Sequence, residues 1–332
     1  MPYAELHAHS AFSFLDGASL PSEIAGRAVE LGYEAVALTD HNGVYGSMEF
    51  AQAAQALGLR AIHGAEVDVV DEPVVRGRPA AARSRDLRRE PPPSRDLRRE
   101  PPPSRHVTLL VRDARGWSNL CRLLTRAHAH VRAPEGGPIV DSPRVTLSDL
   151  EEHAEGLVCL SGCARDGVRD EPTTRRLLGA FGRESFRVEL QRPFQRHDRA
   201  LNRGLAALAA RLGVPCVATG NVHAHTRARA RLQDAFVAIR EHTTLDASEP
   251  LRRGNHAHVL STPQAMAARF ADHAEAVAET ERLAEMLRFD LTSDLGYRYP
   301  GSEDGSADRR LAELCRTLLA DRYAGRSTRR EA

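Results

Sequence analysis

Histidines and carboxylates stand at several points where short apolar runs of the sequence end. His7 and His9 form an HxH pair after the segment YAEL. Residues two apart in a strand point to the same face, so both imidazoles can meet one metal ion. Asp40 and His41 follow the apolar run VALT in the same way. Imidazole and carboxylate groups are metal ligands, and a metal bound to them can activate water.

Further polar side chains occupy similar places along the chain. Asp16 lies in the loop after the HxH pair, Glu66 lies in the segment HGAEV, and Asn221 and His223 follow the apolar run VPCVAT. Each alone has an ordinary structural explanation, as a helix cap, a buried ion pair or a loop histidine. Buried charge is costly unless it is paired or bound to metal. The recurrence at four strand ends therefore predicts one metal site.

The elements that must position these residues alternate between short strands and amphipathic helices. We expect strands at 3–7, 35–39, 60–69, 106–112, 157–161, 185–190 and 214–219, and helices at 21–31, 46–57, 115–130, 149–154, 173–182, 197–212, 226–240, 263–287 and 307–323. A capping box formed by Ser148 and Glu151 is expected to open the helix at 149–154. The β-α-β-α-β order of the first 70 residues predicts a parallel sheet. Repeated β-α units favour a closed barrel, in which strand ends meet at one face.

Residues 71–105 interrupt this pattern. The segment SRDLRREPPP occupies 84–93 and recurs unchanged at 94–103. Triple prolines cannot continue a helix or join a sheet interior, which predicts a disordered or polyproline II insertion. Its arginines could form a DNA-binding arm. We favour a slipped-repeat insertion on the surface, because long surface insertions cost little free energy.

Composition narrows the class of protein. The chain has 332 residues and a formal net charge of +1. Its overall charge therefore gives no indication of nucleic-acid binding. All 46 basic residues are arginine, which excludes lysine chemistry such as Schiff bases. No export signal or membrane span is expected. The five cysteines form no CxxC pair, which is typical of the reducing cytoplasm.

Six segments, in this order, resemble the PHP (polymerase and histidinol phosphatase) domain: ELHAHSAFSFLDGAS, ALTDHNGVYG, HGAEV, HVTLLVRD, LSGC and ATGNVHAH. The resemblance is closest to the N-terminal part of bacterial DNA polymerase III α-type chains of the error-prone subfamily. The segments DARGWSNLCRLLTRAH and RARLQDAFVAIREHTTLD add to it. It implies an α/β fold, a distorted (β/α)7 barrel over 1–70 and 106–289. The start of the following polymerase region, with a short helical extension, would occupy 290–332.

The resemblance also implies the metal ligands, which are His7, His9, Asp16, His41, Glu66, His106, Cys163, Asn221 and His223. They would hold up to three divalent ions, Zn²⁺, Mn²⁺ or Fe²⁺. The family normally has Asp where this chain has Asn221. An amide oxygen can bind a cation but brings no negative charge and cannot bridge two ions, so fewer ions are expected. Glu5 and Asp40 are expected to orient the histidines, and Arg165 and Arg192 are candidates for phosphate contacts.

The function implied is hydrolysis of a phosphoester by a metal-activated water, with a DNA 3′ end as substrate. A polymerase body or repair accessory proteins would be its partners in DNA replication or repair. Two alternatives stay open: a catalytically degenerate PHP scaffold, which Asn221 favours, and a free-standing enzyme similar to histidinol phosphatase. The segment after 290 leaves no room for a polymerase palm, so we expect no DNA synthesis by this chain alone. A fragment, a truncated reading frame and one piece of a split protein all remain open as its origin.

Overall fold

The computed structural model describes residues 2–71, 105–132, 141–296 and 306–323. The repeat at 84–103, and with it the disorder expected for the insertion, lies outside the described residues. The chain divides into two compact units, Met1–Thr292 and Ser293–Ala332. The first unit carries all the predicted metal ligands.

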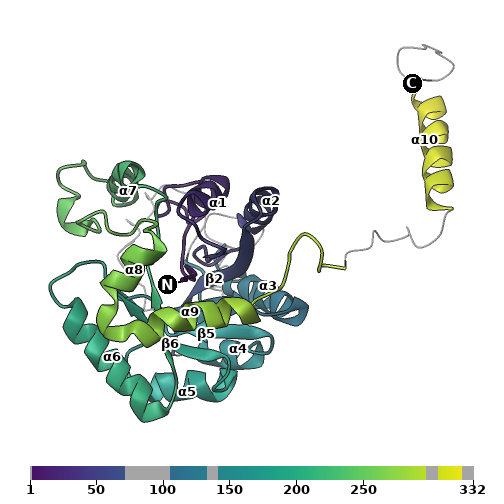
Figure 1. Ribbon diagram of the computed structural model, residues 1–332. Coiled ribbons are helices and arrows are strands. Elements are labelled where there is room, and N and C mark those ends of the chain that lie inside the picture. Colours follow the sequence, from purple (N-terminus) through teal and green to yellow (C-terminus); the bar gives the residue numbers. More distant parts are fainter. Residues whose placement is uncertain (1, 72–104, 133–140, 297–305, 324–332) are drawn as a thin grey trace, which may run out of the picture. The chain divides into compact units, whose positions relative to one another are not determined.

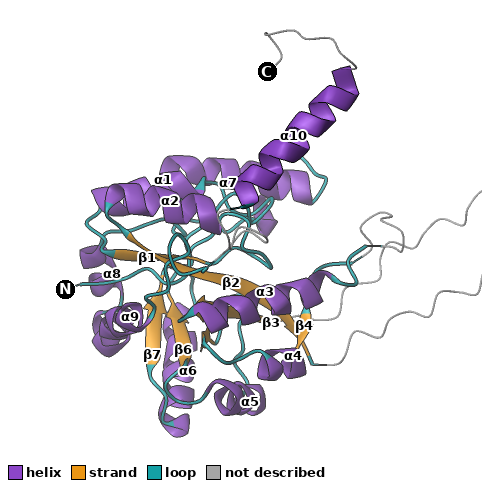
Figure 2. Ribbon diagram, turned by 90° about the vertical axis from the view of Figure 1, so that its right-hand side faces the viewer, coloured by secondary structure: helices purple, strands orange, loops and turns teal. Residues whose placement is uncertain are grey.

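A seven-stranded sheet forms the framework of the first unit (Figure 2). Its strands follow the order β1 (Ala35–Leu38), β2 (Arg60–Val70), β3 (Arg105–Val111), β5 (Leu157–Leu160), β6 (Phe186–Gln191) and β7 (Cys216–Thr219), and β4 (Val145–Thr146) pairs with β2. Neighbouring strands are parallel, as expected for the first 70 residues, except that β3 is antiparallel to both β2 and β5. The beginning of β3 therefore lies at the edge where its neighbours end.

The N-terminal segment connects the two ends of this sheet. The predicted strand at 3–7 is not a regular strand, because only isolated bridges form: Glu5 pairs with Val36 of β1, and Ala8 pairs with Val222 after β7. The amide of Val222 donates to the carbonyl of His7 at 2.9 Å. The sheet is thus curled, and the predicted mixed α/β barrel fold is confirmed.

Helices cover the outside of the curled sheet (Figure 1). They are α1 (Pro21–Glu30), α2 (Ser47–Leu57), α3 (Ala114–His128), α4 (Leu147–Glu152), α5 (Glu171–Phe181), α6 (Asp198–Leu212), α7 (Arg227–Arg240), α8 (Pro263–Arg269) and α9 (Ala274–Met286). Their buried faces consist mainly of Ala, Leu and Val. Most of these pack with strand side chains into one large core, and residues of α9 and α7 join two smaller clusters. None of the described helices is both long and apolar enough to cross a membrane.

Two local predictions are corrected. The helix expected over 263–287 is broken between α8 and α9, where Phe270 leaves the helical conformation with φ of −111° and the 3-10 turn Ala271–His273 follows. The carbonyl of Arg269 accepts from Arg192 at 2.9 Å. That carbonyl is then satisfied without a continuing helix. The capping box of α4 is formed by Thr146 and Asp149 rather than by Ser148 and Glu151. The Thr146 hydroxyl accepts from the Asp149 amide at 3.1 Å, and the Asp149 carboxylate accepts from the Thr146 amide at 2.9 Å.

The second unit contains the helix α10 (Ala307–Tyr323), which has the bounds expected from the sequence. Its large apolar side chains Leu311, Leu314 and Leu318 are exposed.

Candidate metal centre

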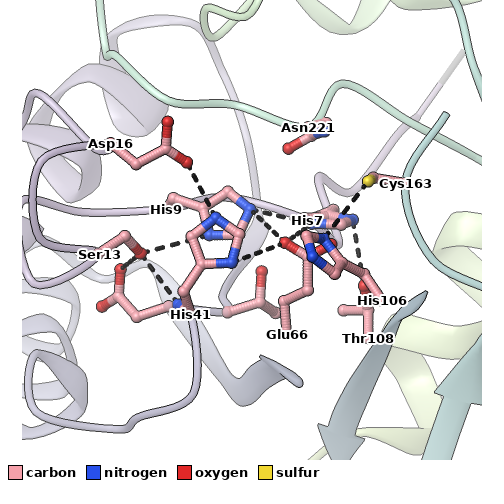
Figure 3. Close-up of polar contacts among 12 residues, drawn as sticks. His7, His9, Ser13, Asp16, His41, Glu66, His106, Thr108, Cys163 and Asn221 are labelled. Atoms are coloured by element: carbon pink, nitrogen blue, oxygen red, sulfur yellow. Dashed lines mark hydrogen bonds and ion pairs between the residues drawn. The ribbon is translucent and has the colours of Figure 1, made fainter. Parts of the chain in front are cut away.

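Glu66 lies at the centre of four histidines, and we call these five residues the Glu66 cluster (Figure 3). Its Oε2 is 3.6 Å from Nε2 of His7, 3.3 Å from Nε2 of His9 and 3.1 Å from Nδ1 of His41. Its Oε1 is 3.1 Å from Nδ1 of His106. The side chain of Glu66 is almost fully buried. One carboxylate thus joins four imidazoles in a buried site.

Four separate segments deliver these side chains to one place. The N-terminal segment provides His7 and His9, and β2 provides Glu66. His41 follows β1, and its main chain forms an isolated parallel β-bridge with Glu66. His106 stands near the start of β3, whereas Glu66 lies inside β2 and His41 follows the end of β1. Because β3 is antiparallel to its neighbours, its start lies at the same face.

The charges within the Glu66 cluster keep the carboxylate of Glu66 anionic. They also shift the pKa values of the neighbouring histidines in opposite directions. Burial raises the pKa of Glu66, but His41 and His7 outweigh this and hold it well below its usual value. Burial lowers the pKa of His7, but Glu189 and Glu66 raise it well above its ordinary value. Burial and the neighbours His41 and His223 lower the pKa of His9. The Nε2 atoms of His7 and His9 are 3.0 Å apart, so at least one of them presents a lone pair.

Carboxylates outside the cluster hold the second ring nitrogen of two histidines. Glu189 of β6 lies 2.7 Å from Nδ1 of His7 and also accepts from Gln191 at 2.7 Å. Asp68 lies 2.8 Å from Nε2 of His106. Such bonds fix the tautomer, so that the other nitrogen faces the cluster.

Sequence reasoning missed both carboxylates, although a signal existed for each. Glu189 stands between Val188 and Leu190 in the buried strand FRVELQ, where an unpaired charge would be costly. Asp68 follows Glu66 by two residues in one strand and so shares its face.

The expected orienting residues Glu5 and Asp40 act on the chain that carries the histidines. Glu5 accepts from the amide of His7 at 3.0 Å and from the amide of Gly220 at 3.0 Å. Its burial raises its pKa to about 7. Asp40 accepts from the hydroxyl of Ser13 at 2.7 Å, and that hydroxyl lies 3.4 Å from Nδ1 of His9.

Asp16 and His223 form the opposite end of the site, which we call the Asp16 corner. Oδ2 of Asp16 is 2.9 Å from Nε2 of His41 and 3.0 Å from Nε2 of His223. Arg253, which sequence reasoning missed, also reaches this corner. Its Nη2 lies 2.9 Å from Oδ2 of Asp16 and 2.6 Å from Nε2 of His223. Burial and Arg253 lower the pKa of His223 to about 4.

Asn221 adopts a left-handed backbone conformation with φ of 47°, which asparagine tolerates better than most residues. Its Nδ2 donates to Oε1 of Gln191 at 3.3 Å. Its buried Oδ1 has no hydrogen-bond partner among the described residues. The side-chain oxygen at the position where the resemblance predicts a carboxylate therefore has no hydrogen-bond partner in the described part of the chain.

Cys163 lies on the other side of the cluster from Asp16 (Figure 3). Its Sγ is 3.7 Å from Nδ1 of His106 and accepts from the amide of Asp166 at 3.4 Å. The side chain is buried. The thiol can thus extend the site beyond His106.

The donor atoms fit divalent metal ions. Among the described residues, four groups of three ligand atoms lie within 4.8 Å of one another: His9, His41 and His223; His7, His9 and Glu66; His41, Glu66 and His106; and His106, Cys163 and Asp166. Asp16 belongs to none of them. Mixed imidazole, carboxylate and thiol donors suit Zn²⁺, Mn²⁺ or Fe²⁺.

Two cavities open beside the centre. The larger, of about 440 Å³, is lined by Asp16, His41, Glu66 and His106, among others. The smaller, of about 260 Å³, includes Gln191, Gln195, Arg252 and His258 in its wall. Arg165, Asn221 and Arg253 line both. Arg192 has a different place, because its guanidinium pairs with Asp272 through two contacts of 2.6 Å.

Comparison with known proteins agrees with this geometry. Residues 5–193 match the model of the PHP domain. The chain is 38% identical over 341 residues to the error-prone DNA polymerase of Mycolicibacterium paratuberculosis, covering 97% of this chain and 28% of that protein. It is 32% identical over 352 residues to the error-prone DNA polymerase of Symbiobacterium thermophilum, covering 99% of this chain and 29% of that protein. The chain thus spans less than a third of the length of these relatives.

Among solved structures, the chain is similar to a protein from Bifidobacterium adolescentis described as a metal-dependent phosphoesterase. The match has a TM-score of 0.45 and 16% identity, and it covers 67% of this chain and 88% of the other.

Proposed function

Because the chain belongs to the PHP domain family, we propose that it is a metal-dependent phosphoesterase that hydrolyses the phosphodiester at a DNA 3′ end. The observation that carries this proposal is the Glu66 cluster. Five buried or half-buried donor residues converge at this point, and metal ions can replace the protons that pair Glu66 with the imidazoles in the metal-free chain. The donor types match metals that activate water.

The residues of the Glu66 cluster would hold the divalent ions, because both oxygens of Glu66 face histidines. Oε2 faces His7, His9 and His41, and Oε1 faces His106. When bound, such ions supply a hydroxide near neutral pH and positive charge for the phosphoryl group.

Three carboxylates of the chain prepare these histidines. Glu189 holds Nδ1 of His7, and Asp68 holds Nε2 of His106. Asp16 holds Nε2 of His41, whose Nδ1 faces Glu66. In each case the bonded nitrogen is the donor, so the other nitrogen can present its lone pair to the cluster. We therefore interpret Asp16 as a positioning residue rather than as a ligand.

The surroundings of the cluster suit a nucleic-acid strand. Arg165, Arg240 and Arg253 line the larger cavity and can bind phosphate oxygens. Phe14 lines it too, and its side chain is 83% exposed. An exposed aromatic ring beside arginines is the arrangement on which bases of single strands stack. The relatives are named as DNA polymerases, which supports DNA as the substrate.

The proposal also implies a cellular setting. A polymerase body or repair accessory proteins in the cytoplasm would be the partners. The catalytic barrel would comprise residues 1–70 and 106–289, with 71–105 as an insertion.

Hydrolysis of a 3′-recessed primer in the presence of Mn²⁺ or Zn²⁺ tests the activity. We expect the wild-type chain to release nucleoside 5′-monophosphates and His9→Ala to lose this activity. Arg196→Ala, which changes an exposed arginine outside both cavity walls, serves as the matched control. Equal rates for wild type and His9→Ala would contradict the proposal.

A second candidate is a PHP scaffold without catalysis. The contacts of Arg253 in the Asp16 corner favour it. The guanidinium binds the side-chain atoms of Asp16 and His223 that the family resemblance assigns to a metal ion. This candidate predicts a folded chain that binds no metal and hydrolyses neither DNA nor histidinol phosphate. Preferential hydrolysis of histidinol phosphate would instead indicate the free-standing phosphatase.

A further inference from the structure

Arg253 takes up the acceptors of the Asp16 corner. Its Nη2 is 3.1 Å from Oδ1 and 2.9 Å from Oδ2 of Asp16, and 2.6 Å from Nε2 of His223. A guanidinium only donates hydrogen bonds, so Nε2 of His223 must act as the acceptor. A metal ion at this corner would need the same carboxylate oxygens and the same lone pair. Arg253 and a metal ion therefore exclude each other here.

Charge at this corner also matches an arginine. Asp16 contributes one negative charge, whereas Asn221 contributes none. Arg253 at 2.9 Å and, farther away, Arg240 at 3.9 Å already neutralise this carboxylate. A divalent ion bound to Asp16 and His223 would keep an uncompensated positive charge in a buried place. The loss of the carboxylate at 221 and the presence of Arg253 thus point to the same arrangement.

The loop that carries Arg253 is anchored on both sides. The Nε atom of Arg252 donates to the hydroxyl of Ser248 at 3.0 Å. The side-chain amide of Asn255 donates to the carbonyl of Pro193. The side chain of Arg253 itself is only 17% exposed. These contacts hold the guanidinium at the corner.

We propose that Arg253 takes the place of a metal ion at the Asp16 corner and that it binds a phosphoryl oxygen of the substrate. This inference rests on the proposed function. Arg253 lines both cavities, together with Arg165 and Asn221. All its hydrogen bonds to described residues come from Nη2. The other N–H groups of a guanidinium can bind a phosphate oxygen, and Asp16 fixes their direction.

Counting bound metal tests the first part. After equilibrium dialysis against Mn²⁺, we expect two ions per wild-type chain. Arg253→Ala should add a weakly bound third ion, and Asn221→Asp with Arg253→Ala should hold that ion tightly. Arg165 lines the same two cavities but, among the described residues, forms no hydrogen bond or ion pair with Asp16, so the Arg165→Ala variant should still bind two ions. Arg253→Met, which keeps the apolar stem, replaces the alanine variant if that variant does not fold.

Three ions in the wild-type chain would overturn the inference, as would two ions in the double variant. No bound metal in the wild-type chain would instead refute the proposed function, so the two failures are distinguishable.

Binding of inorganic phosphate tests the second part. Arg253→Ala should weaken the affinity of the metal-loaded chain for phosphate about tenfold, as expected for the loss of one charged hydrogen bond. Arg196→Ala is the control and should leave this affinity unchanged. Unchanged affinity in Arg253→Ala would show that the guanidinium does not contact the phosphoryl group.

Discussion

The two ends of the centre are built from similar residues but differ in what neutralises them. In the Glu66 cluster, one buried carboxylate faces four imidazoles, and no guanidinium contacts it among the described residues. In the Asp16 corner, a carboxylate and an imidazole face Arg253. This difference between the two ends indicates that histidines and carboxylates, which can bind metal, do not by themselves make a metal site. The charge of the nearest neighbour decides between a metal ion and an ion pair.

The histidines show the same contrast. Carboxylates raise the pKa of His7 against the effect of burial. Burial and Arg253 lower the pKa of His223 to about 4. Nδ1 of His7 contacts the carboxylate of Glu189, whereas Nδ1 of His223 contacts the main-chain carbonyl of Asn221 at 2.9 Å. At the first end a carboxylate thus holds the outer ring nitrogen of the histidine, whereas at the second end a main-chain carbonyl does so.

Replacing Glu66 should have the largest effect. Glu66→Gln keeps the shape of the side chain but removes the negative charge shared by four histidines. We expect metal affinity to fall by more than the 10–100-fold that loss of an outer partner costs. Elemental analysis should find no tightly bound metal, and hydrolysis should be lost. If the Glu66→Gln variant retained two ions, metal binding by the Glu66 cluster would not depend on its carboxylate, and the contrast with the Asp16 corner would be wrong.

His63 tests what burial does to a histidine that has no hydrogen-bonded carboxylate among the described residues. The charge of Asp290 raises its pKa, but burial outweighs this effect. Both of its ring nitrogens are buried without a partner among the described residues, and burial lowers its pKa to about 4. An unfolded histidine has a pKa of about 6.5, so folding expels its proton. Its contribution to stability is complete above pH 6.5 and is lost as pH falls towards 4. The loss amounts to about 3 kcal/mol.

We therefore expect His63→Leu to lose less stability than the wild type between pH 7 and pH 4. Urea unfolding of the metal-free proteins at several pH values measures the difference. His197→Leu, at an exposed position, is the control. A pH dependence of His63→Leu equal to that of the wild type would show that burial alone does not neutralise histidines in this fold.

Glu189→Gln should have a smaller effect on the first end. Its amide can still contact Nδ1 of His7, but it no longer favours the proton there. We expect metal affinity to fall 10–100-fold, while the free energy of unfolding of the metal-free chain changes less. Titration with Zn²⁺ measures the affinity, and Glu151→Gln, at an exposed position, is the control. Unchanged affinity would show that Glu189 only fills space.

Asp16→Asn should have the smallest effect. The amide oxygen can still accept from Nε2 of His41, so we expect at most about a tenfold loss of metal affinity. The number of bound ions should not change, because Asp16 positions His41 and does not hold metal. A fall by one ion would mean that the Asp16 corner binds metal despite Arg253.

Much of the first end could be predicted from the sequence. His7, His9 and His41 follow apolar runs, and strand ends meet at one face of a barrel. His106 could be placed only through family resemblance, because it begins a strand instead of ending one. The antiparallel direction of β3 explains its place, and no local pattern reveals that direction.

Arg253 could not be predicted. It is separated from Asp16 by 237 residues and stands in a loop without periodic pattern. In a chain whose 46 basic residues are all arginine, nothing distinguishes this one. The sequence did reveal Asn221 as a missing charge. What compensates for it depends on tertiary contacts.

The most direct test of this account is the position of the metal ions in crystals of the chain grown with Mn²⁺. An anomalous difference map locates manganese independently of activity. We predict manganese peaks within bonding distance of Glu66. We also predict that the Arg253 guanidinium lies between Asp16 and His223. A manganese peak bonded to Asp16 and His223, with Arg253 displaced, would contradict the account.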